Sequence, residues 1–270
     1  MLGTDLVKIL EEKHRVSGAD LNEVDIRNGD SVRHCVEKFK PDAVINAAGY
    51  TDVDGSEKDR ENAFAVNALG ARNVASAAKG IGARSVYFST DYVFDGLKRE
   101  PYKEDDTTGP QGIYARSKLE GEIGVREADP ESLIIRTAWL FGKNGRNFVD
   151  TIIRVAGQKD RLDVVDDQRG SPTWTRHLSI AVEKLIMVQA KGVFHVTNSG
   201  EVTWCEFAKK ILEKVGKNIP VTPITTAMLN RPAPRPAYSV LDNSKYRRMT
   251  GHEMPHWEKG LDGYLKERVI

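Results

Sequence analysis

Short apolar runs alternate with helical patterns through the first half of the chain. Runs of strand type lie at Ala43 to Asn46, Ser85 to Ser89 and Leu133 to Arg136, and helical patterns separate them. Strands that are buried on both faces of a parallel sheet have this compact apolar composition. The alternation predicts an α/β fold, with right-handed crossovers and a doubly wound parallel sheet that carries helices on both faces.

Polar residues follow each of these strands directly. They lie at Asn46 to Thr51, Ser89 to Asp95 and Thr137 to Phe141, and Asp20 follows a further short strand predicted at Arg15 to Ala19. In doubly wound sheets, ligands bind outside the carboxyl ends of the strands. We therefore expect the functional site at this edge of the sheet.

Tyr114 and Lys118 are four residues apart in a predicted helix that spans about 113 to 127, so their side chains share one face. A free phenol titrates near pH ~10, so proton transfer at neutral pH requires a pKa shift of about 3 units, or roughly 4 kcal/mol. A fixed lysine charge is one source of that stabilisation. The alternative is a tyrosine packed on the helix and a solvated lysine one turn later.

The overall charge and composition exclude several classes of partner. The 270 residues carry a net charge of +1 with mixed signs along the chain, so we expect no nucleic-acid partner. No apolar run approaches the roughly 20 residues of a membrane helix and no signal-peptide pattern is present, which predicts a cytoplasmic protein without a membrane partner. Cys35 and Cys205 lie far apart without a Cys/His cluster, so we expect buried thiols and no metal site.

Several motifs occur in the order and spacing of one enzyme family. They are Asp25-Ile26, Asn46-Ala47-Ala48, Val66-Asn67, Ser89-Thr90-Asp91-Tyr92-Val93-Phe94-Asp95-Gly96, Tyr114-x-x-x-Lys118 and Arg136-Thr137-x-Trp139. Through them the chain resembles the extended short-chain dehydrogenase/reductases, and within these most closely the dTDP-4-dehydrorhamnose reductase family. The resemblance spans nearly the whole chain, and the octapeptide combined with Tyr-x-x-x-Lys is far more specific than either motif alone.

The resemblance implies a Rossmann-like fold and the reduction of a ketone. The expected cofactor is NADH or NADPH, and Asp20 favours the 2′-hydroxyl of NADH. The expected reaction reduces the C4 ketone of dTDP-4-dehydro-L-rhamnose to give dTDP-L-rhamnose. Tyr114 would act as the general acid, Lys118 would lower the pKa of Tyr114 and hold the nicotinamide ribose, and Thr90 would polarise the ketone.

The resemblance also assigns binding residues and domains. Positions that match the cofactor site are Gly3, Asp20, Asp25, Ile26, Ala47, Ala48, Gly49, Tyr50, Thr51, Asn67, Phe88, Tyr114 and Lys118. Positions that match the substrate site are Thr90, Asp91, Tyr92, Trp139, Gln168 and Arg235, whose guanidinium suits a diphosphate but is equally expected to be solvated. The dinucleotide-binding domain is expected over residues 1–146 plus about 175–190, and a substrate-binding lobe over 147–174 and 191–270.

The start of the chain departs from the family pattern. The family begins with a central strand and a glycine-rich turn, G-x-x-G-x-x-G, of which only Leu2-Gly3 has a counterpart here. The first strand and most of the turn, about ten residues, are therefore expected to be missing from the fold. Because the turn's backbone N–H groups hold the pyrophosphate, a site without it is expected to bind the cofactor poorly.

Two other functions fit the same residues. One is the reduction of a different 4-keto nucleotide sugar, since pocket residues such as Trp139, Gln168 and Trp174 do not assign a sugar. The other is non-catalytic, because the chain also resembles the regulatory β subunit of methionine adenosyltransferase, whose partner is the synthetase. The partners expected otherwise are a small-molecule nucleotide-sugar substrate and, as one candidate assembly, a second copy of the chain in a homodimer.

Overall fold

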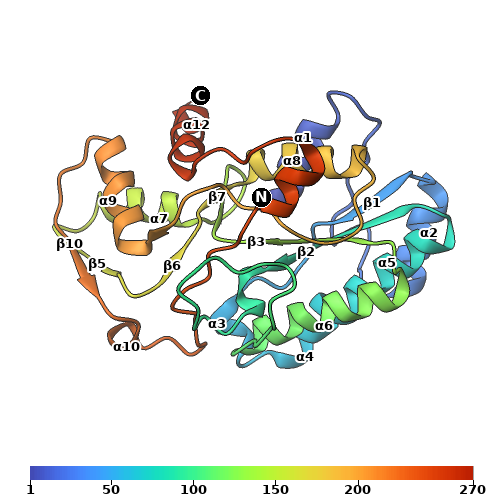
Figure 1. Cartoon of the computed structure of the whole chain (residues 1–270), viewed down its shortest axis with the longest axis horizontal. Helices are drawn as coiled ribbons and strands as arrows, with labels where there is room; N and C mark the ends of the chain where they lie inside the picture. Colours follow the sequence, from blue (N-terminus) through green and yellow to red (C-terminus); the bar gives the residue numbers. More distant parts are fainter. Residues whose placement is uncertain (270) are drawn as a thin grey trace.

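Four parallel strands form the main sheet of the computed structural model, which describes residues 1–269 (Figure 1). Their order in the sheet is β1 (Ala43–Asn46), β2 (Arg84–Thr90), β3 (Leu133–Thr137) and β8 (Gly192–His195). The predicted α/β fold with a parallel sheet is confirmed. The carboxyl ends of the strands meet at one edge, where Thr90 lies opposite Thr137.

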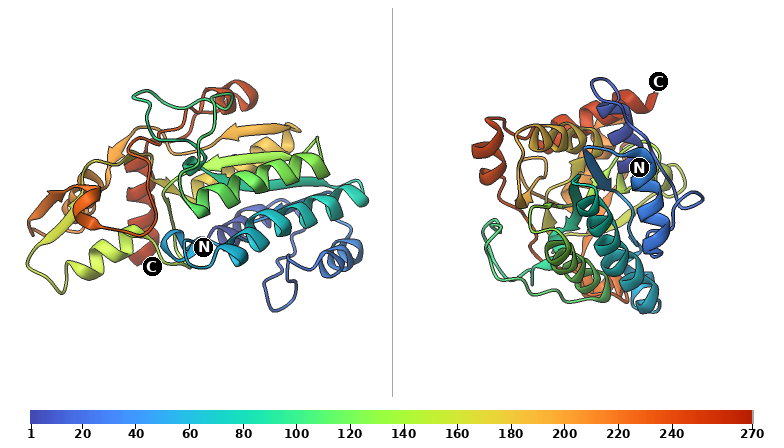
Figure 2. Two further views of the ribbon diagram at one scale, coloured as in Figure 1. Left: turned by 90° about the horizontal axis from the view of Figure 1, so that it is seen from below. Right: turned by 90° about the vertical axis from the view of Figure 1, so that its right-hand side faces the viewer.

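Helices cover both faces of this sheet. Helices α1 (Leu2–Leu10) and α8 (Thr175–Met187) pack on one face, whereas α5 (Ala71–Gly80) and α6 (Ile113–Ala128), which lie side by side in Figure 2, cover the other. Strand β2 contributes side chains to the apolar core on each face of the sheet, because successive side chains of a strand point to opposite faces. Phe88 packs in the core with α1 and α8, and Tyr87 packs in the core with α5 and α6.

A second apolar core belongs to a smaller lobe, on the left in Figure 1. It joins α7 (Phe148–Val155), α9 (Trp204–Lys214) and α12 (Trp257–Val269) to the parallel pair β5 (Leu162–Val165) and β10 (Val221–Ile224). The division into two domains stays a prediction, but its boundary at 191 needs a correction. Strand β8 pairs with β3 in the main sheet, so residues 192–195 belong to the larger unit.

The other elements are short, except for the helix α2. They are α2 (Gly29–Phe39), α3 (Val53–Ser56), α4 (Arg60–Phe64), the π-helix η1 (Ala65–Gly70), the 3₁₀ helix η2 (Asp91–Val93), β4 (Leu140–Phe141), β6 (Arg169–Gly170), β7 (Thr173–Trp174), β9 (Val202–Thr203), α10 (Thr226–Leu229) and α11 (Ser244–Thr250). Across residues 1–269, each helix is too short or too polar to cross a lipid bilayer.

Two predicted elements differ in the structure. The strand predicted at Arg15 to Ala19 is a loop, because no described strand lies beside it to complete a ladder. The helical pattern predicted between Asn46 and Ser85 is not one regular helix, because the π-helix η1 lies between α4 and α5. Such turns are frequent at functional sites, and here Asn67 lies on the turn with its side chain buried.

Gly121 lets α6 lie directly against η1 and β2. A Cβ at this position would collide with the Asn67 carbonyl oxygen and with the Tyr87 hydroxyl. Gly121→Ala is therefore expected to lower the free energy of unfolding by about 1–3 kcal/mol, measured by urea denaturation. Gly80→Ala is the matched control, since a Cβ there meets nothing within 4 Å. Equal stability of the two variants would contradict the close contact.

Candidate active site

Thr90 and Tyr114 meet where β2 ends and α6 begins. Thr90 caps η2, because its hydroxyl accepts a hydrogen bond from the Tyr92 N–H at 3.2 Å. Tyr114 lies in the first turn of α6, where the Ile113 N–H donates to Glu57 Oε1 at 2.8 Å. The ring of Tyr92, the residue whose N–H bonds to Thr90, packs edge-on against the ring of Tyr114. The structure thus joins two of the three predicted catalytic residues.

Burial controls the protonation of Tyr114. Loss of solvation raises the pKa of Tyr114 to about 12, and the nearby hydroxyl of Thr90 opposes this only in part. The ring of Tyr92 lies edge-on to it, with centroids 6.0 Å apart. The pKa of Tyr114 is raised in this structure, and the predicted effect of Lys118 on it stays a prediction. A phenol that keeps its proton at neutral pH suits proton donation to a reacting oxygen.

Lys118 lies one turn after Tyr114 and its ammonium turns toward β2. It donates a hydrogen bond to the Phe88 carbonyl at 2.5 Å and lies over the Tyr87 ring, 4.2 Å from its centroid. Burial lowers the pKa of Lys118 to about 7, and the charge of Glu122 opposes this shift. Near neutral pH the amine is therefore only partly protonated, and a π face and a carboxylate stabilise its charge.

Glu122 extends the face of α6 that carries Tyr114 and Lys118 by one more turn. Its two oxygens accept hydrogen bonds from the Arg136 guanidinium, each at 2.8 Å, and both side chains are buried. His195 lies beside this ion pair, 3.5 Å from it, and burial together with the Arg136 charge lowers the pKa of His195 to about 3. We did not predict a role for Glu122 from the sequence, although its spacing of four from Lys118 was a usable signal.

Asp91 lies directly behind Thr90. It is 2 % exposed, and its Oδ1 accepts a hydrogen bond from Thr90 Oγ1 at 3.0 Å. Burial raises the pKa of Asp91 to about 7, and the hydroxyls of Ser239 and Thr90 oppose this shift. Asp91 therefore contacts the predicted catalytic residue Thr90, and it also occupies a predicted substrate-binding position.

Unpartnered polar atoms line the carboxyl edge of the sheet. Asn46 Nδ2, Ser89 Oγ and Thr137 Oγ1, at the ends of β1, β2 and β3, are buried without a hydrogen-bond partner in the described part of the chain. Native structures seldom leave such atoms unpaired, so their alignment fits a polar ligand. A nicotinamide dinucleotide is a ligand of this kind.

The turn after β1 lies beside this edge. Ala47, Ala48, Gly49 and Thr51 are exposed, and Tyr50 is held by Asn67, whose amide bonds the N–H and the carbonyl of Tyr50 at 2.9 and 3.1 Å. Gly3 lies in the first turn of α1, and a Cβ there would lie 3.6 Å from the Ala47 Cβ. The N-terminus of α1 therefore lies next to the predicted cofactor turn. Asn67 supports the turn rather than facing solvent.

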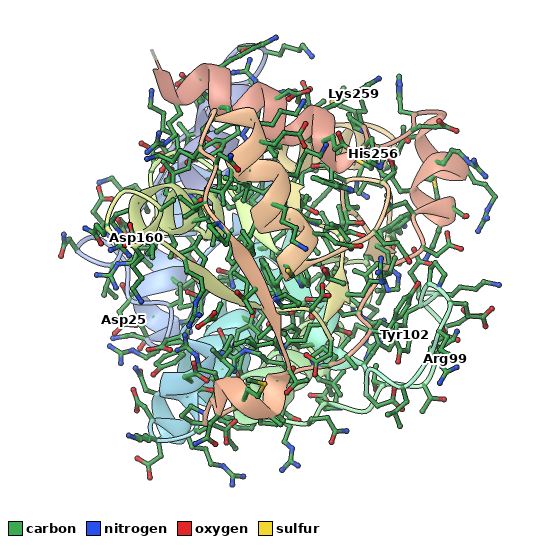
Figure 3. The ribbon with its side chains drawn as sticks, turned by 90° about the vertical axis from the view of Figure 1, so that its left-hand side faces the viewer. Asp25, Arg99, Tyr102, Asp160, His256 and Lys259 are labelled. Carbon is green, nitrogen blue, oxygen red and sulfur yellow. The ribbon has the colours of Figure 1, made fainter. Side chains whose placement is uncertain are left out.

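Three further predicted cofactor positions, Asp20, Asp25 and Ile26, lie on the loop between α1 and α2. Asp20 Oδ1 accepts the Leu21 N–H at 2.7 Å, and Asp25 forms a salt bridge with Arg27 at 2.7 Å. The hydrogen bond from Arg27 lowers the pKa of Asp25. In Figure 3 Asp25 lies on the left, far from Tyr102 on the right. Ile26 packs close to the turn η1, and no described contact joins Asp20 to Tyr114.

Trp139 stacks on Trp204 at the boundary of the two lobes. The ring centroids are 3.4 Å apart with planes 5° from parallel, and the indole N–H of Trp204 donates to Gln168 Oε1 at 3.2 Å. Trp139 has a φ of 48°, which is unfavourable for a bulky residue. The structure thus joins two predicted substrate residues, Trp139 and Gln168, through Trp204, for which we predicted no role.

Arg235 has a carboxylate partner in this structure. Its guanidinium donates to both oxygens of Asp54, each at 3.0 Å, and Arg231 donates to the same carboxylate at 3.2 Å. The Arg235 side chain is only 17 % exposed, so it is not the solvated loop arginine of the alternative. The charge of Arg235 also acts on Tyr92, which places it on the side of the site near Tyr114.

A doubly wound parallel sheet with a threonine and a Tyr-x-x-x-Lys helix at its carboxyl edge defines the class of extended short-chain dehydrogenase/reductases. Within this class, the family model described as RmlD substrate binding domain matches residues 1–270, and the chain belongs to that family.

Relatives and solved structures agree with this assignment. A dTDP-4-dehydrorhamnose reductase of Sinorhizobium fredii is 40 % identical over 87 % of this chain and 83 % of its own. A probable dTDP-4,6-dihydroxy-2-methyloxan-3-one 4-ketoreductase of Streptomyces antibioticus is 38 % identical over 97 % of this chain and 90 % of its own. The crystal structure of a dTDP-4-dehydrorhamnose reductase from Bacillus anthracis in complex with NADP is 41 % identical, covers 98 % of this chain and 95 % of that chain, and superposes with a TM-score of 0.95.

Proposed function

We propose that the protein is an NAD(P)H-dependent oxidoreductase that reduces the C4 ketone of dTDP-4-dehydro-L-rhamnose to dTDP-L-rhamnose. The observation that supports this proposal is the position of Thr90 at the end of β2 and of Tyr114 in the first turn of α6, with Tyr92 in contact with both at the carboxyl edge of the sheet. The relatives from Sinorhizobium fredii and Bacillus anthracis, which bear this activity in their names, match the chain over most of its length.

Tyr114, Thr90 and Lys118 have separate roles in the proposed reduction. The nicotinamide cofactor supplies the hydride when bound. Tyr114 donates its proton to the ketone oxygen as negative charge develops there. Thr90 lies near the phenol, and its predicted polarisation of the ketone requires its hydroxyl proton to turn away from Asp91. Lys118 holds the nicotinamide ribose with an amine that burial keeps close to its neutral form.

The binding residues that we propose are those that the family resemblance assigns. We assign the cofactor to Gly3, Asp20, Asp25, Ile26, Ala47, Ala48, Gly49, Tyr50, Thr51, Phe88 and Lys118, with Asn67 supporting the turn. We assign the nucleotide sugar to Asp91, Tyr92, Trp139, Gln168 and Arg235. The cofactor is NADH or NADPH, and the structure from Bacillus anthracis, solved with NADP, supports a nicotinamide dinucleotide. For Arg235 to reach a diphosphate, it must exchange Asp54 for the ligand.

The experiment is a direct assay of the reduction. The protein is incubated with dTDP-4-dehydro-L-rhamnose and either NADH or NADPH, and the loss of absorbance at the wavelength of the reduced cofactor is followed. We expect turnover with at least one cofactor and a dTDP-L-rhamnose product. Absence of turnover with both cofactors would refute the proposal.

A second candidate is the reduction of another 4-keto nucleotide sugar. The relative from Streptomyces antibioticus, whose name gives a different dTDP-linked ketone, favours it. The two candidates are separated by kcat/KM for each ketosugar under the same conditions. The regulatory subunit of a methionine adenosyltransferase remains a third prediction, and stable co-purification with the synthetase would support it.

Location and assembly are further proposals. We place the reaction in the cytoplasm, because charged nucleotides cross a lipid bilayer only at a high free-energy cost. The homodimer stays a prediction, and sedimentation of the purified protein measures it.

A further inference from the structure

Two arginines and a backbone N–H of one loop converge on a single carboxylate. The arginine loop, residues 231–235, follows α10 and runs beside α3 (Figure 1). Arg235 donates to both oxygens of Asp54, each at 3.0 Å. Arg231 donates to Oδ2 of the same carboxylate at 3.2 Å, and the Ala233 N–H donates to Oδ1 at 3.3 Å. The arginine loop therefore forms a cradle of donors, and the Asp54 carboxylate occupies it.

The donors of this cradle are of the kind that bind phosphate groups. A guanidinium pairs with carboxylates and with phosphates through the same fork of N–H groups, and backbone N–H groups contribute to anion sites. Two guanidinium charges face one carboxylate charge, so the cluster keeps an excess positive charge. A diphosphate carries more negative charge than a single carboxylate, so it matches this cluster better.

Prolines hold the arginine loop in an extended form. Pro232, Pro234 and Pro236 alternate with the other residues, and each fixes its own φ and restricts the residue before it. The loop also packs on the larger lobe, because a Cβ at Gly112 would lie 3.4 Å from Pro234 and a Cβ at Gly96 would collide with Pro236. Gly112 is the N-cap residue of α6. The cradle is therefore preorganised beside the helix that carries the predicted proton donor.

Asp54 can leave the cradle without unfolding its helix. The first turn of α3 is capped by Asp52, whose Oδ1 accepts the Gly55 N–H at 2.9 Å, so α3 does not depend on Asp54. The Asp54 side chain is 21 % exposed, so water reaches it. Burial alone would raise the pKa of Asp54, but the hydrogen bonds from Arg235 and Ala233 lower it. Asp54 is thus an ionised group that competes with an anionic ligand for the same donors.

We propose that the arginine loop binds the diphosphate of the nucleotide sugar through Arg231 as well as Arg235, and that Asp54 holds this site until the substrate displaces it. The proposal rests on the proposed function for the identity of the nucleotide. When the diphosphate binds, both guanidinium groups and the Ala233 N–H exchange the carboxylate for phosphate oxygens, and water solvates Asp54. Asp54 therefore lowers the affinity for every anion, and it disfavours ligands that carry too little charge to displace it.

The test is Asp54→Asn, with nucleotide binding measured by isothermal titration calorimetry. The amide keeps the shape of the side chain but removes the charge that holds the two guanidinium groups. We expect Kd for dTDP to fall by about five- to tenfold, and Kd for thymidine, which has no phosphate, to stay unchanged. In the reductase assay KM for the ketosugar is expected to fall, with kcat within about twofold of the parent.

Two further variants complete the test. Asp59→Asn is the matched control, because it removes the same charge nearby while its side chain contacts Asn62 rather than either arginine. It is expected to leave Kd for dTDP within about twofold of the parent, since an exposed charge at a distance is screened by salt. Arg231→Gln removes one guanidinium and is expected to raise Kd for dTDP about tenfold. This variant leaves Asp54 in place and serves if Asp54→Asn does not fold.

The nicotinamide cofactor also contains a diphosphate, so Kd for NADPH is measured in the same variants. We expect it to stay unchanged, because the predicted cofactor turn follows β1 and lies outside the arginine loop. A gain in NADPH affinity in place of dTDP affinity would assign the cradle to the cofactor and overturn the proposal.

Two other results overturn the inference. One is an unchanged or weaker affinity for dTDP in Asp54→Asn, which would mean that Asp54 orients the arginines instead of competing with the ligand. The other is a parent protein that reduces the ketosugar but binds dTDP no more tightly than thymidine, which would leave the proposed function standing. Conversely, a gain in dTDP affinity without any turnover of the ketosugar would support the diphosphate site and refute the proposed function alone.

Discussion

Tyr114→Phe is expected to reduce kcat for the ketosugar by about 10³-fold or more, because it removes the proton donor of the reduction. The phenol is partly buried and desolvation raises its pKa to about 12, so it is protonated in nearly every molecule at neutral pH. Phenylalanine retains the ring and its edge-on contact with Tyr92. The measurement is steady-state cofactor oxidation together with cofactor Kd by fluorescence titration, and Kd is expected to stay within about twofold.

The matched control is Tyr246→Phe. Tyr246 is also buried, but it lies in the core between α8 and β8, and its hydroxyl lies near Thr250 rather than in the site. The same loss of a hydroxyl there is expected to leave kcat unchanged. Equal loss of turnover and cofactor binding in Tyr114→Phe, together with a lower melting temperature, would show that Tyr114 is structural.

Glu122→Ala is expected to lower the free energy of unfolding by about 3–5 kcal/mol, the largest stability effect that we predict. Glu122 is fully buried and bonds both arms of Arg136, so its removal leaves an uncompensated guanidinium in the core. That charge lies 3.5 Å from His195, a neutral side chain that cannot compensate it. Urea denaturation measures the loss.

A double-mutant cycle isolates the ion pair. Glu122→Leu with Arg136→Leu removes both charges and is expected to be far less unstable than the sum of the two single variants. Glu213→Ala serves as the surface control. Glu213 forms a salt bridge with Lys210 and its side chain is exposed, and salt bridges of this kind contribute about 0.2–1 kcal/mol to the free energy of unfolding. Additive losses in the cycle would mean that the two side chains stabilise the core independently.

Sequence patterns predicted the strands and the helix that surround the candidate site. The apolar runs predicted β1, β2 and β3, and the polar residues that follow them lie at one edge because parallel strands share their direction. The octapeptide that contains Thr90 and the spacing of Tyr114 from Lys118 identified the class. These signals are local, since a strand, a turn and one face of a helix each occupy consecutive residues.

The errors came from features that depend on distant neighbours. Residues 15–19 have a strand-like composition but form a loop, because a strand requires a partner along its edge. Strand β8 has too short a pattern to assign to a lobe, and only its pairing with β3 places it in the main sheet. The salt bridge of Arg235 with Asp54 joins residues far apart in the chain, and the spacing along the sequence contains no signal for it.

By itself the sequence determined the class of fold and the edge of the sheet where ligands are expected, since both follow from local periodicity, and its motifs gave the family resemblance that assigns the proposed proton donor. Only the tertiary structure decided the protonation of the side chains in the candidate site. Burial raises the pKa of Tyr114 and Asp91 and lowers the pKa of Lys118. The fold also brings Glu122 and Arg136 together in a buried salt bridge. Desolvation depends on every element packed around a group, so it cannot be read from the residues next to it in the chain.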